Sequence, residues 1–446
     1  MNTEYARELL TRKLVAQRAA MTTAQTYYDN DQPLRSFMDP EVDRTLNGRV
    51  RPLNVGFGGL AVDVLAQRLS VVGFATSSTD LSDAGLWDLW RRNDMGTQSE
   101  LAHTAALVYG RAYYLAWTGP DGAPRITVES PMQCTILRDP LTSAITHAIK
   151  RWIDPEGYSR TLLFSADEVI EYASPSMTSP DPLLPTTALP ITGEDAVEVS
   201  RQRNPLGMVP MVALVNRPSL TGLDGESELR DLMPLIDAIG KLSSDLLVAS
   251  EYSASPRRYV TGLFPDTRLT QEQMRELAQE IRSTWENAYA AKILVAPDHR
   301  TQFGTFETAT LDNYIAAITM LTQQIAALAA LPPYYLTLNT ANPTSADAIR
   351  ASEQRLTAKA EQRQRQWSGA YADLMRLALM IRDGRPYTGL IETQWRSAAP
   401  ATLAQTADAE AKLVGAGIVD RATALAALGY TPLEIERITT NEGIVA

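Results

Sequence analysis

Residues 332–356 read PPYYLTLNTANPTSADAIRASEQRL and join two segments of strong helical character. The apolar segment before them must leave the helical conformation at Pro332, because proline removes a backbone donor and restricts the residue that precedes it. Further on, Thr344 or Ser345 provides a favourable N-cap for the next helix. The stretch therefore predicts a helix, a loop that ends at Thr344, and a long helix over 345–382.

Charge is distributed unevenly around this loop. No charged residue occurs from Asn313 to Ala346, and basic residues then follow within a few turns, at Arg350, Arg355, Lys359, Arg363 and Arg365. A buried helix followed by a solvated one would explain this pattern without any function. The spacing of four residues places Arg355, Lys359 and Arg363 on one face of the predicted helix.

The helix expected before the loop is Leu311–Leu331, and its part Ile315–Leu331 is the segment of the chain nearest to a membrane span. Its central residues Thr322-Gln323-Gln324 favour a helix packed among protein neighbours instead, and we expect no membrane association. Its apolar residues recur at helical spacing, which predicts one packed face. That face consists of Leu311, Ile315, Ile318, Leu321, Ile325 and Leu328.

The sequence before residue 225 predicts an α+β region. A helix over 2–20 and several later helical segments are followed by short alternating runs typical of strands between Arg111 and Tyr172. Residues 174–210 are rich in Pro, Ser and Thr and lack periodicity, which predicts a long mobile surface loop. The rest of the chain is expected to be mostly helical.

Composition excludes several classes of protein. The 446 residues are 45% hydrophobic, enough for packed cores, and the formal net charge of −11 argues against tight sequence-specific DNA binding. The single cysteine, Cys134, and three scattered histidines offer neither a disulfide nor a metal site. The charged N-terminus lacks the features of a secretory signal, which indicates a cytosolic origin. We predict no catalytic, cofactor-binding or metal-binding residues.

One motif points to an enzyme. Gly56-x-Gly58-x-x-Ala61 has the spacing of a dinucleotide-binding loop, which makes a nucleotide-binding enzyme the alternative hypothesis. A buried apolar strand should precede such a loop, whereas Arg49–Val55 contains two arginines and a proline. We therefore interpret the glycines as permitting a tight backbone crossing into the following helix.

Several segments in succession resemble the portal proteins of tailed bacteriophages, specifically the siphophage type found in actinobacteriophages. The resemblance covers nearly the whole chain, and the order of the segments carries it. They are YYDNDQPL (27–34), RVRPLNVGFGGLAVDVLAQRLSVVGF (49–74), GESEL (225–229), PPYYLTLNTANPTSADAIRASEQRL (332–356) and the C-terminal AKLVGAGIVDRATALAALGYTPLEIERI.

The resemblance implies a portal fold with an α/β wing, a helical stem, a small α/β clip, a long helix behind a tunnel loop, and a helical crown. The expected boundaries are 1–225 for the wing with its mobile loop 174–210, 226–254 and 311–331 for the stem helices, 255–310 for the clip, 332–344 for the tunnel loop, 345–399 for the long helix and return to the wing, and 400–446 for the crown.

The resemblance also implies a function. Portal subunits form a ring, typically of twelve, at one capsid vertex of the virion, and double-stranded DNA passes through it without sequence specificity. The implied partners are the terminase, the major capsid protein and a head-tail adaptor, with assembly in the host cytoplasm. The expected channel-facing residues are Tyr334, Tyr335, Asn339, Thr340 and Asn342.

The basic face of the long helix leaves two alternatives open. Arg355, Lys359 and Arg363 either meet acidic residues of the neighbouring subunit or form a weak belt that faces the DNA phosphates. We favour the contact between subunits.

Overall fold

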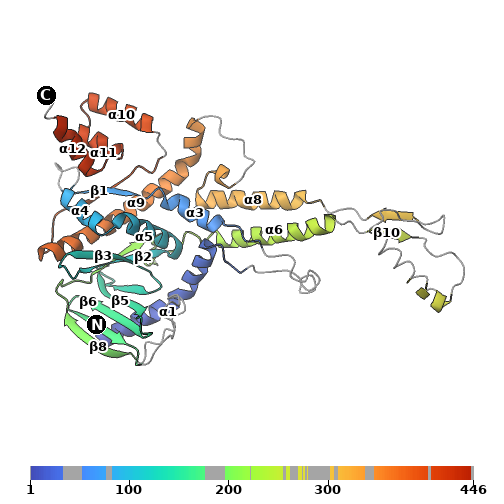
Figure 1. Cartoon of the computed structure of the whole chain (residues 1–446), viewed down its shortest axis with the longest axis horizontal. Helices are drawn as coiled ribbons and strands as arrows, with labels where there is room; N and C mark the ends of the chain where they lie inside the picture. The colour runs from blue at the N-terminus through green and yellow to red at the C-terminus, as the bar shows by residue number, and fades with distance from the viewer. Residues whose placement is uncertain are drawn as a thin grey trace. The chain divides into compact units, whose positions relative to one another are not determined.

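A computed structural model describes residues 2–33, 53–76, 83–175, 196–220, 222–254, 258–261, 270–273, 275–276, 279, 302–305, 310–336, 346–399 and 403–442. The chain forms two compact units. The first consists of Met1–Arg35, Asn54–Gly240 and Thr319–Ala446, and the second of Ser36–Leu53 and Lys241–Ile318. Helices and antiparallel sheets occur together in the first unit (Figure 1), so the predicted α+β class is confirmed.

The helices are α1 (Thr3–Tyr28), α3 (Phe57–Ala66), α4 (Ala84–Arg92), α5 (Met95–Tyr109), α6 (Met233–Ala254), α8 (Asp312–Ala329), the 3-10 turn η2 (Pro333–Tyr335), α9 (Ala346–Asp383), α10 (Leu403–Gly415), α11 (Arg421–Ala427) and α12 (Pro432–Glu442). The strands are β1 (Val71–Ala75), β2 (Arg111–Thr118), β3 (Pro124–Glu129), β4 (Cys134–Arg138), β5 (Ile145–Ile153), β6 (Ser159–Ser165), β7 (Glu168–Ala173), β8 (Val197–Arg203), β9 (Met211–Val215), β10 (Arg258–Thr261), β11 (Gln302–Thr305) and β12 (Glu392–Trp395).

The core of the first unit is built in layers around the three-stranded sheet β3-β2-β9. Successive side chains of β2 point to opposite faces of this sheet. Tyr113 packs with Cys134 and Ile136 of the five-stranded sheet β4-β5-β6-β7-β8, whereas the hydroxyl of Tyr114 lies 2.9 Å from that of Tyr371 in α9. The three-stranded sheet is therefore a middle layer between helices and a second sheet.

Helix α1 covers the other face of the five-stranded sheet. Leu10, which is fully buried, packs there against Ile149, Leu163 and Ile170, one from each of three neighbouring strands. Neighbouring residues on the same strands, such as Phe164, point to the opposite face and join the core between the two sheets. This alternation is why the strands β5 to β7 are recognisable in the sequence.

An aromatic cluster lies on the helical side of the middle sheet. His103 of α5 stacks on Trp367 with ring centroids 5.1 Å apart, and its Nε2 lies 2.6 Å from the hydroxyl of Tyr371. Complete burial lowers the pKa of His103 to about 3, although a hydrogen bond with the Leu69 backbone opposes the shift. His103 is thus a neutral structural side chain at ordinary pH.

Some expected elements differ from the structure. Helix α1 continues to Tyr28, beyond the predicted end at residue 20, because Met21, Ala24 and Tyr27 extend its buried face. The loop predicted over 174–210 contains β8, an edge strand whose seven residues are all exposed and which therefore shows no alternation. Residues 176–195 of that loop lie outside the described residues. The other predicted domain boundaries stay predictions.

In the second unit, β10 pairs with β11 in an antiparallel ladder, with Arg258 opposite Thr305 and Thr261 opposite Gln302. Most of the predicted clip, 255–310, lies outside the described residues.

Candidate functional site

The site of interest is the point where the chain leaves α8 and enters the predicted tunnel loop. Ala330, the residue after α8, has the left-handed φ of 63°, and Leu331 N donates to Ala326 O at 2.9 Å. This pattern closes a helix C-terminus and satisfies one of its free carbonyl groups. The prolines that follow prevent further helix, so the predicted helix end before Pro332 is confirmed.

Two tyrosines of the 3-10 turn η2 are held by one carboxylate. The Tyr334 hydroxyl donates to Glu353 Oε1 at 2.6 Å and the Tyr335 hydroxyl donates to the same oxygen at 3.0 Å. Glu353 Oε2 accepts from Arg68 Nη2 at 3.0 Å, and Arg68 Nη1 donates to Ala398 O at 2.7 Å. The start of the loop is therefore tied to α9, to the residues after α3 and to the segment after β12.

The electrostatics of this contact favour an ionised Glu353. Its side chain is only 6% exposed, and burial alone would raise the pKa of the carboxyl group. Hydrogen bonds from Tyr334, Arg68 and Tyr335 outweigh burial and lower this pKa below its usual value. In turn, burial and the bond to Glu353 raise the pKa of both tyrosines, so their hydroxyls stay protonated donors.

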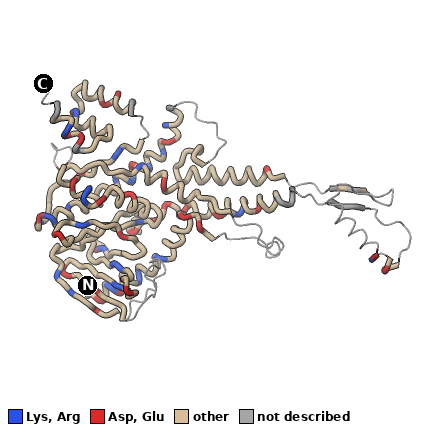
Figure 2. The backbone as a smooth tube through the Cα atoms, in the orientation of Figure 1, with Lys and Arg blue, Asp and Glu red and all other residues tan. Residues whose placement is uncertain are grey.

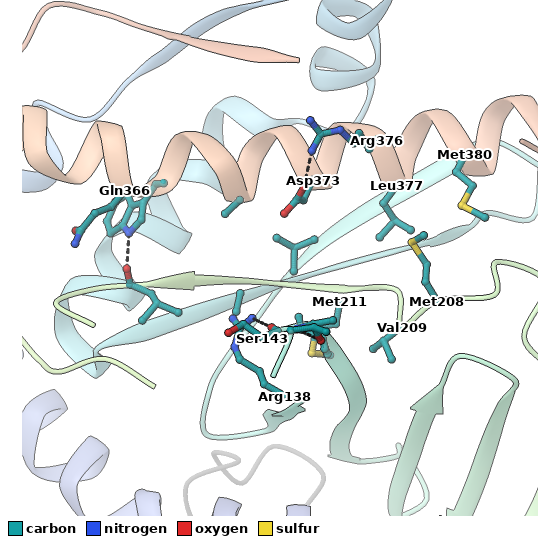
Figure 3. A pocket seen from close by; sticks show the side chains of 18 of the residues that line it. Arg138, Ser143, Met208, Val209, Met211, Gln366, Asp373, Arg376, Leu377 and Met380 are labelled. Atoms are coloured by element: carbon teal, nitrogen blue, oxygen red, sulfur yellow. Dashed lines mark hydrogen bonds and ion pairs between the residues drawn. The ribbon is translucent and has the colours of Figure 1, made fainter. Parts of the chain in front are cut away.

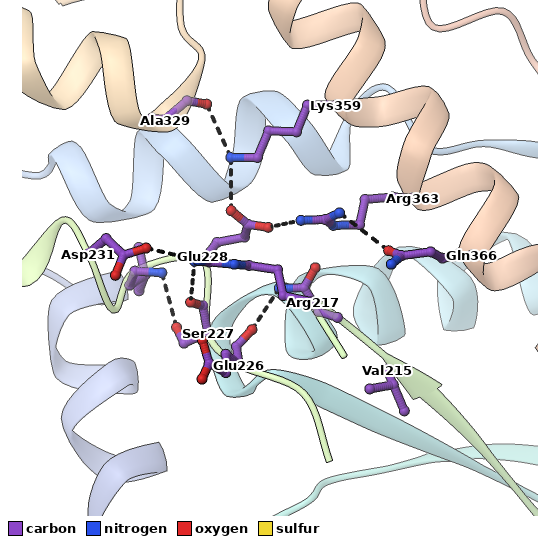
Figure 4. Close-up of polar contacts among 12 residues, drawn as sticks. Val215, Arg217, Glu226, Ser227, Glu228, Asp231, Ala329, Lys359, Arg363 and Gln366 are labelled. Atoms are coloured by element: carbon purple, nitrogen blue, oxygen red, sulfur yellow. Dashed lines mark hydrogen bonds and ion pairs between the residues drawn. The ribbon is translucent and has the colours of Figure 1, made fainter. Parts of the chain in front are cut away.

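A second buried carboxylate, Glu228, joins α9 to the end of α8 (Figure 4). Glu228 Oε2 lies 2.8 Å from Lys359 Nζ, and Glu228 Oε1 forms an ion pair with Arg363. Lys359 Nζ also donates to Ala329 O at 3.2 Å, at the C-terminus of α8, where a cation is favourable. The backbone of Glu228 is fixed by its N–H, which donates to Leu107 O at 2.9 Å.

Glu228 is the more strongly perturbed of the two carboxylates. Its side chain is 6% exposed, and that of Arg363 is 4% exposed. Burial raises the pKa of Glu228, but the charges and hydrogen bonds of Lys359 and Arg363 outweigh it and lower the pKa to about 2. The two basic side chains thus favour the ionised form of a carboxylate inside the protein.

This cluster gives two residues of the basic face of the long helix a partner within the chain. Lys359 and Arg363 both pair with Glu228. The predicted contact of this face with a neighbouring subunit or with DNA phosphates stays a prediction. Sequence spacing placed Lys359 and Arg363 correctly on one face but could not reveal that Glu228 lies opposite. Arg355 is exposed and keeps both alternatives open.

The predicted channel residues divide into two groups. The hydroxyls of Tyr334 and Tyr335 donate to Glu353 of the same chain, and the expectation that these two residues face the channel stays a prediction. Asn339, Thr340 and Asn342 lie outside the described residues. Arg68, Glu228 and Glu353 all lie in the segments that resemble portal proteins, but no local pattern of the sequence assigns a role to any of them.

The face predicted for the helix before the loop is also partly wrong. The buried stripe of α8 consists of Thr322, Ile325, Ala326 and Ala329. Ile315 and Leu328 are 54% and 56% exposed, respectively, in the chain by itself. Figure 2 shows the charge contrast between the two helices, since α8 has one charged residue, Asp312, and α9 has many.

The glycine motif belongs to a helix crossing. A Cβ atom on Gly58 would lie 2.4 Å from Tyr27 O, and one on Gly59 would lie 3.0 Å from Tyr28 O. The end of α1 occupies this space, and its carbonyl oxygens would repel a phosphate. The next strand, β1, pairs antiparallel with β12, unlike the parallel strands of a dinucleotide-binding fold. The nucleotide-binding alternative is not supported.

Two further kinds of site are absent from the part of the chain that the structure describes. No group of three or more His, Cys, Asp or Glu side chains there could hold a metal ion. None of its helices is long and apolar enough to cross a membrane.

Comparison with known proteins agrees with the resemblance seen in the sequence. The family model described as "Phage portal protein, SPP1 Gp6-like" matches residues 9–441. The portal proteins of Mycobacterium phages L5 and D29 are each 31% identical to this chain over 402 residues, covering 86% of it and 78% of their own length.

A solved structure has a similar fold. It is a chain from the neck of an empty GTA particle, computed with C6 symmetry, and it matches with a TM-score of 0.50 and 15% identity. The match covers 87% of this chain and 94% of that chain, and at this identity it shows the fold alone. Because the family model spans almost the whole sequence and two curated relatives are 31% identical to it over 402 residues, the chain belongs to the SPP1 Gp6-like family of phage portal proteins.

Proposed function

We propose that this portal protein assembles into a ring of twelve subunits at one vertex of the capsid, with genomic DNA passing along the ring axis during packaging and ejection. Membership of the portal family is the observation that carries the proposal. The exposed apolar side chains of α8, Ile315, Met320 and Leu328, support it, because a neighbouring subunit would cover them.

In this proposal the protein acts as a DNA channel and as the connection between head and tail, and not as an enzyme. The terminase supplies the motor, the major capsid protein surrounds the ring, and a head-tail adaptor binds to it. The wing, stem, clip and crown keep the boundaries expected from the sequence. Assembly takes place in the host cytoplasm before the ring becomes part of the virion.

The loop over 332–344 faces the DNA in this proposal. Its first residues have a rigid base, because Tyr334 and Tyr335 bind Glu353, which is in turn bound by Arg68. The loop has no charged residue, which suits a surface that must contain DNA without holding it. Each added cation that neutralises a phosphate would increase a salt-dependent attraction, and a ring repeats that attraction in every subunit.

A single substitution in the loop tests this placement. Thr340→Lys places one positive charge in every subunit, and Thr340→Gln is the control of similar length without charge. The lysine ring should assemble normally but package DNA several-fold more slowly at low salt, with recovery as salt screens the charge. The measurement is the rate at which DNA becomes resistant to nuclease inside heads that contain each ring.

Two outcomes would contradict the proposal. Equal packaging rates for the lysine and glutamine rings at low salt would place residue 340 away from the DNA path. A purified protein that never forms rings, and that heads do not incorporate, would contradict the assembly itself.

A further inference from the structure

The sheet β3-β2-β9 has an open edge at β9. Asn216 N, one residue beyond β9, donates to Gly110 O at 2.8 Å, and the antiparallel register continues from Arg111 opposite Val215 to Leu115 opposite Met211. Residues of an antiparallel ladder alternate between facing the partner strand and facing away from it. The main-chain groups of the odd-numbered residues of β9 therefore point away from β2.

One of these outward groups has a partner. Val215 O accepts a hydrogen bond from Trp367 Nε1 of α9 at 2.8 Å. The outward N–H and C=O groups of Met211 and Ala213 make no hydrogen bond with any residue that the structure describes. A strand edge of this kind is a template for pairing with another extended chain.

A groove with a volume of about 720 Å³ runs along this edge. Leu377 and Met380 of α9 form one wall, and Arg138 and the start of β5 at Ile145 form the other (Figure 3). The walls are the same two layers that cover the faces of the middle sheet. The groove is thus the position that a fourth strand of this sheet would occupy.

The side chains that line the groove indicate which residues an added strand would carry. Each wall mixes apolar and polar side chains: Leu377 and Met380 lie beside the ion pair of Asp373 and Arg376 on α9, and Ile145 lies beside Thr142 and Ser143 on the other wall. An added strand would place apolar side chains against Leu377, Met380 and Ile145. Arg138 lies at the rim, where its Nη1 donates to Ser143 O at 2.9 Å, and it has no ion pair among the described residues. A carboxylate on the added segment would be complementary to this guanidinium.

We propose that β9 accepts an extended segment of a second protein, about as long as the five residues of β9, with apolar side chains against Leu377, Met380 and Ile145 and an acidic residue near Arg138. The partner is a component of the assembled particle other than this chain. The described part of this chain has one fully exposed edge strand, β8, whose sequence VEVSRQR would bury charged side chains against both walls. The inference rests on the proposed function for the particle in which the partner is sought.

Hydrogen exchange tests the pairing directly. The amides of Met211 and Ala213 should exchange freely in the purified ring, and at least about tenfold more slowly when the ring is part of assembled heads. The amide of Leu214, which faces β2, should be protected in both states. Mass spectrometry of peptides that span β9 measures all three.

A proline variant tests whether the open edge is the cause. Ala213→Pro removes an outward N–H that the sheet does not use, and proline is tolerated at such edge positions. Ala213→Val keeps the N–H while adding a side chain of similar size. In heads, the proline variant should lose the protection at Met211 and the valine variant should retain it.

Three results would overturn the proposal. Exchange at Met211 and Ala213 that is equally fast in rings and heads would leave the edge unoccupied. Protection already present in the purified ring would assign the groove to a second copy of this chain. Protection at Met211 that survives Ala213→Pro would come from burial without strand pairing. The Thr340→Lys experiment reports on the loop alone, so failure of either proposal is distinguishable from failure of the other.

Discussion

Two buried carboxylates connect segments that are far apart in the sequence. Glu228 binds Lys359 and Arg363 in α9, and Glu353 binds Arg68 and the two tyrosines of η2. Removing one partner of such a cluster leaves a charge that is buried and uncompensated, which costs far more than the intact cluster contributes. Both carboxylates are therefore expected to be sensitive positions.

Glu228→Gln should lower the free energy of unfolding by about 3–5 kcal/mol, because Lys359 and Arg363 would remain charged without a counter-charge. Glu226→Gln, two residues earlier, is the control. Its carboxylate pairs with Arg230 at 2.5 Å, but the two side chains are 39% and 62% exposed, so the loss should stay below about 1 kcal/mol. Urea unfolding measures the loss in free energy of unfolding for each variant. Equal losses would contradict the prediction that the buried cluster is more sensitive than the exposed ion pair.

His103 predicts a loss of stability in mild acid. The unfolded chain takes up a proton on this histidine near pH 6.5, whereas the folded chain does so only near its lowered pKa of about 3. Between these values the unfolded state binds more protons, so stability falls as the pH falls, by at most about 1.4 kcal/mol per pH unit.

Urea unfolding between pH 7 and pH 4.5 tests this prediction. His103→Gln should flatten the dependence of stability on pH in the upper part of that range, where carboxyl groups do not yet titrate. His147→Gln is the control, because His147 is only half-buried, and burial lowers its pKa less than it lowers the pKa of His103. An unchanged slope in His103→Gln would contradict a buried neutral histidine.

Helix α8 is followed by one residue with a strained backbone conformation. Ala330 adopts a left-handed φ of 63°, which costs an alanine about 1 kcal/mol more than a glycine. The conformation is retained because the bond from Leu331 N to Ala326 O and the prolines that follow define the exit from the helix. The start of the loop is thus specified by its backbone as well as by Glu353.

Two alanine-to-glycine substitutions should have opposite effects here. Ala330→Gly should raise the free energy of unfolding by about 1 kcal/mol, because it relieves the left-handed strain. Ala329→Gly, one residue earlier, should lower it by a similar amount, because residue 329 is helical and glycine is a poor helix former. Thermal unfolding compares the two, and a loss of stability in both would contradict the strain.

The whole molecule carries a formal charge of −11, which opposes the association of identical copies. Rings should therefore assemble more completely as salt rises from ~0.1 M to ~1 M, over which the Debye length falls from about 10 Å to about 3 Å. Sedimentation velocity measures the assembled fraction, and circular dichroism checks that the chain stays folded. Dissociation of rings on adding salt would instead show that opposite charges hold the interface.

Local patterns in the sequence were enough to determine much of this protein. Proline at 332 ended a helix, alternation in β5 to β7 identified strands with two distinct faces, and the order of segments identified the portal family. These features depend on neighbours within a few residues, for which backbone sterics and side-chain periodicity are sufficient. β8 is an exposed edge strand in which the alternation of Val197 and Val199 stops after four residues, at Arg201, so the sequence did not reveal it.

The partners of the buried charges were decided only by the tertiary structure. Arg363 and Glu228 are 135 residues apart, and Arg68 and Glu353 are 285 apart, so no local pattern relates them. A basic helix face looks the same in sequence whether it meets a carboxylate of its own chain, a neighbour or a phosphate. Folding decides among these, because burying a charge is tolerable only where the packing of distant segments places an opposite charge against it.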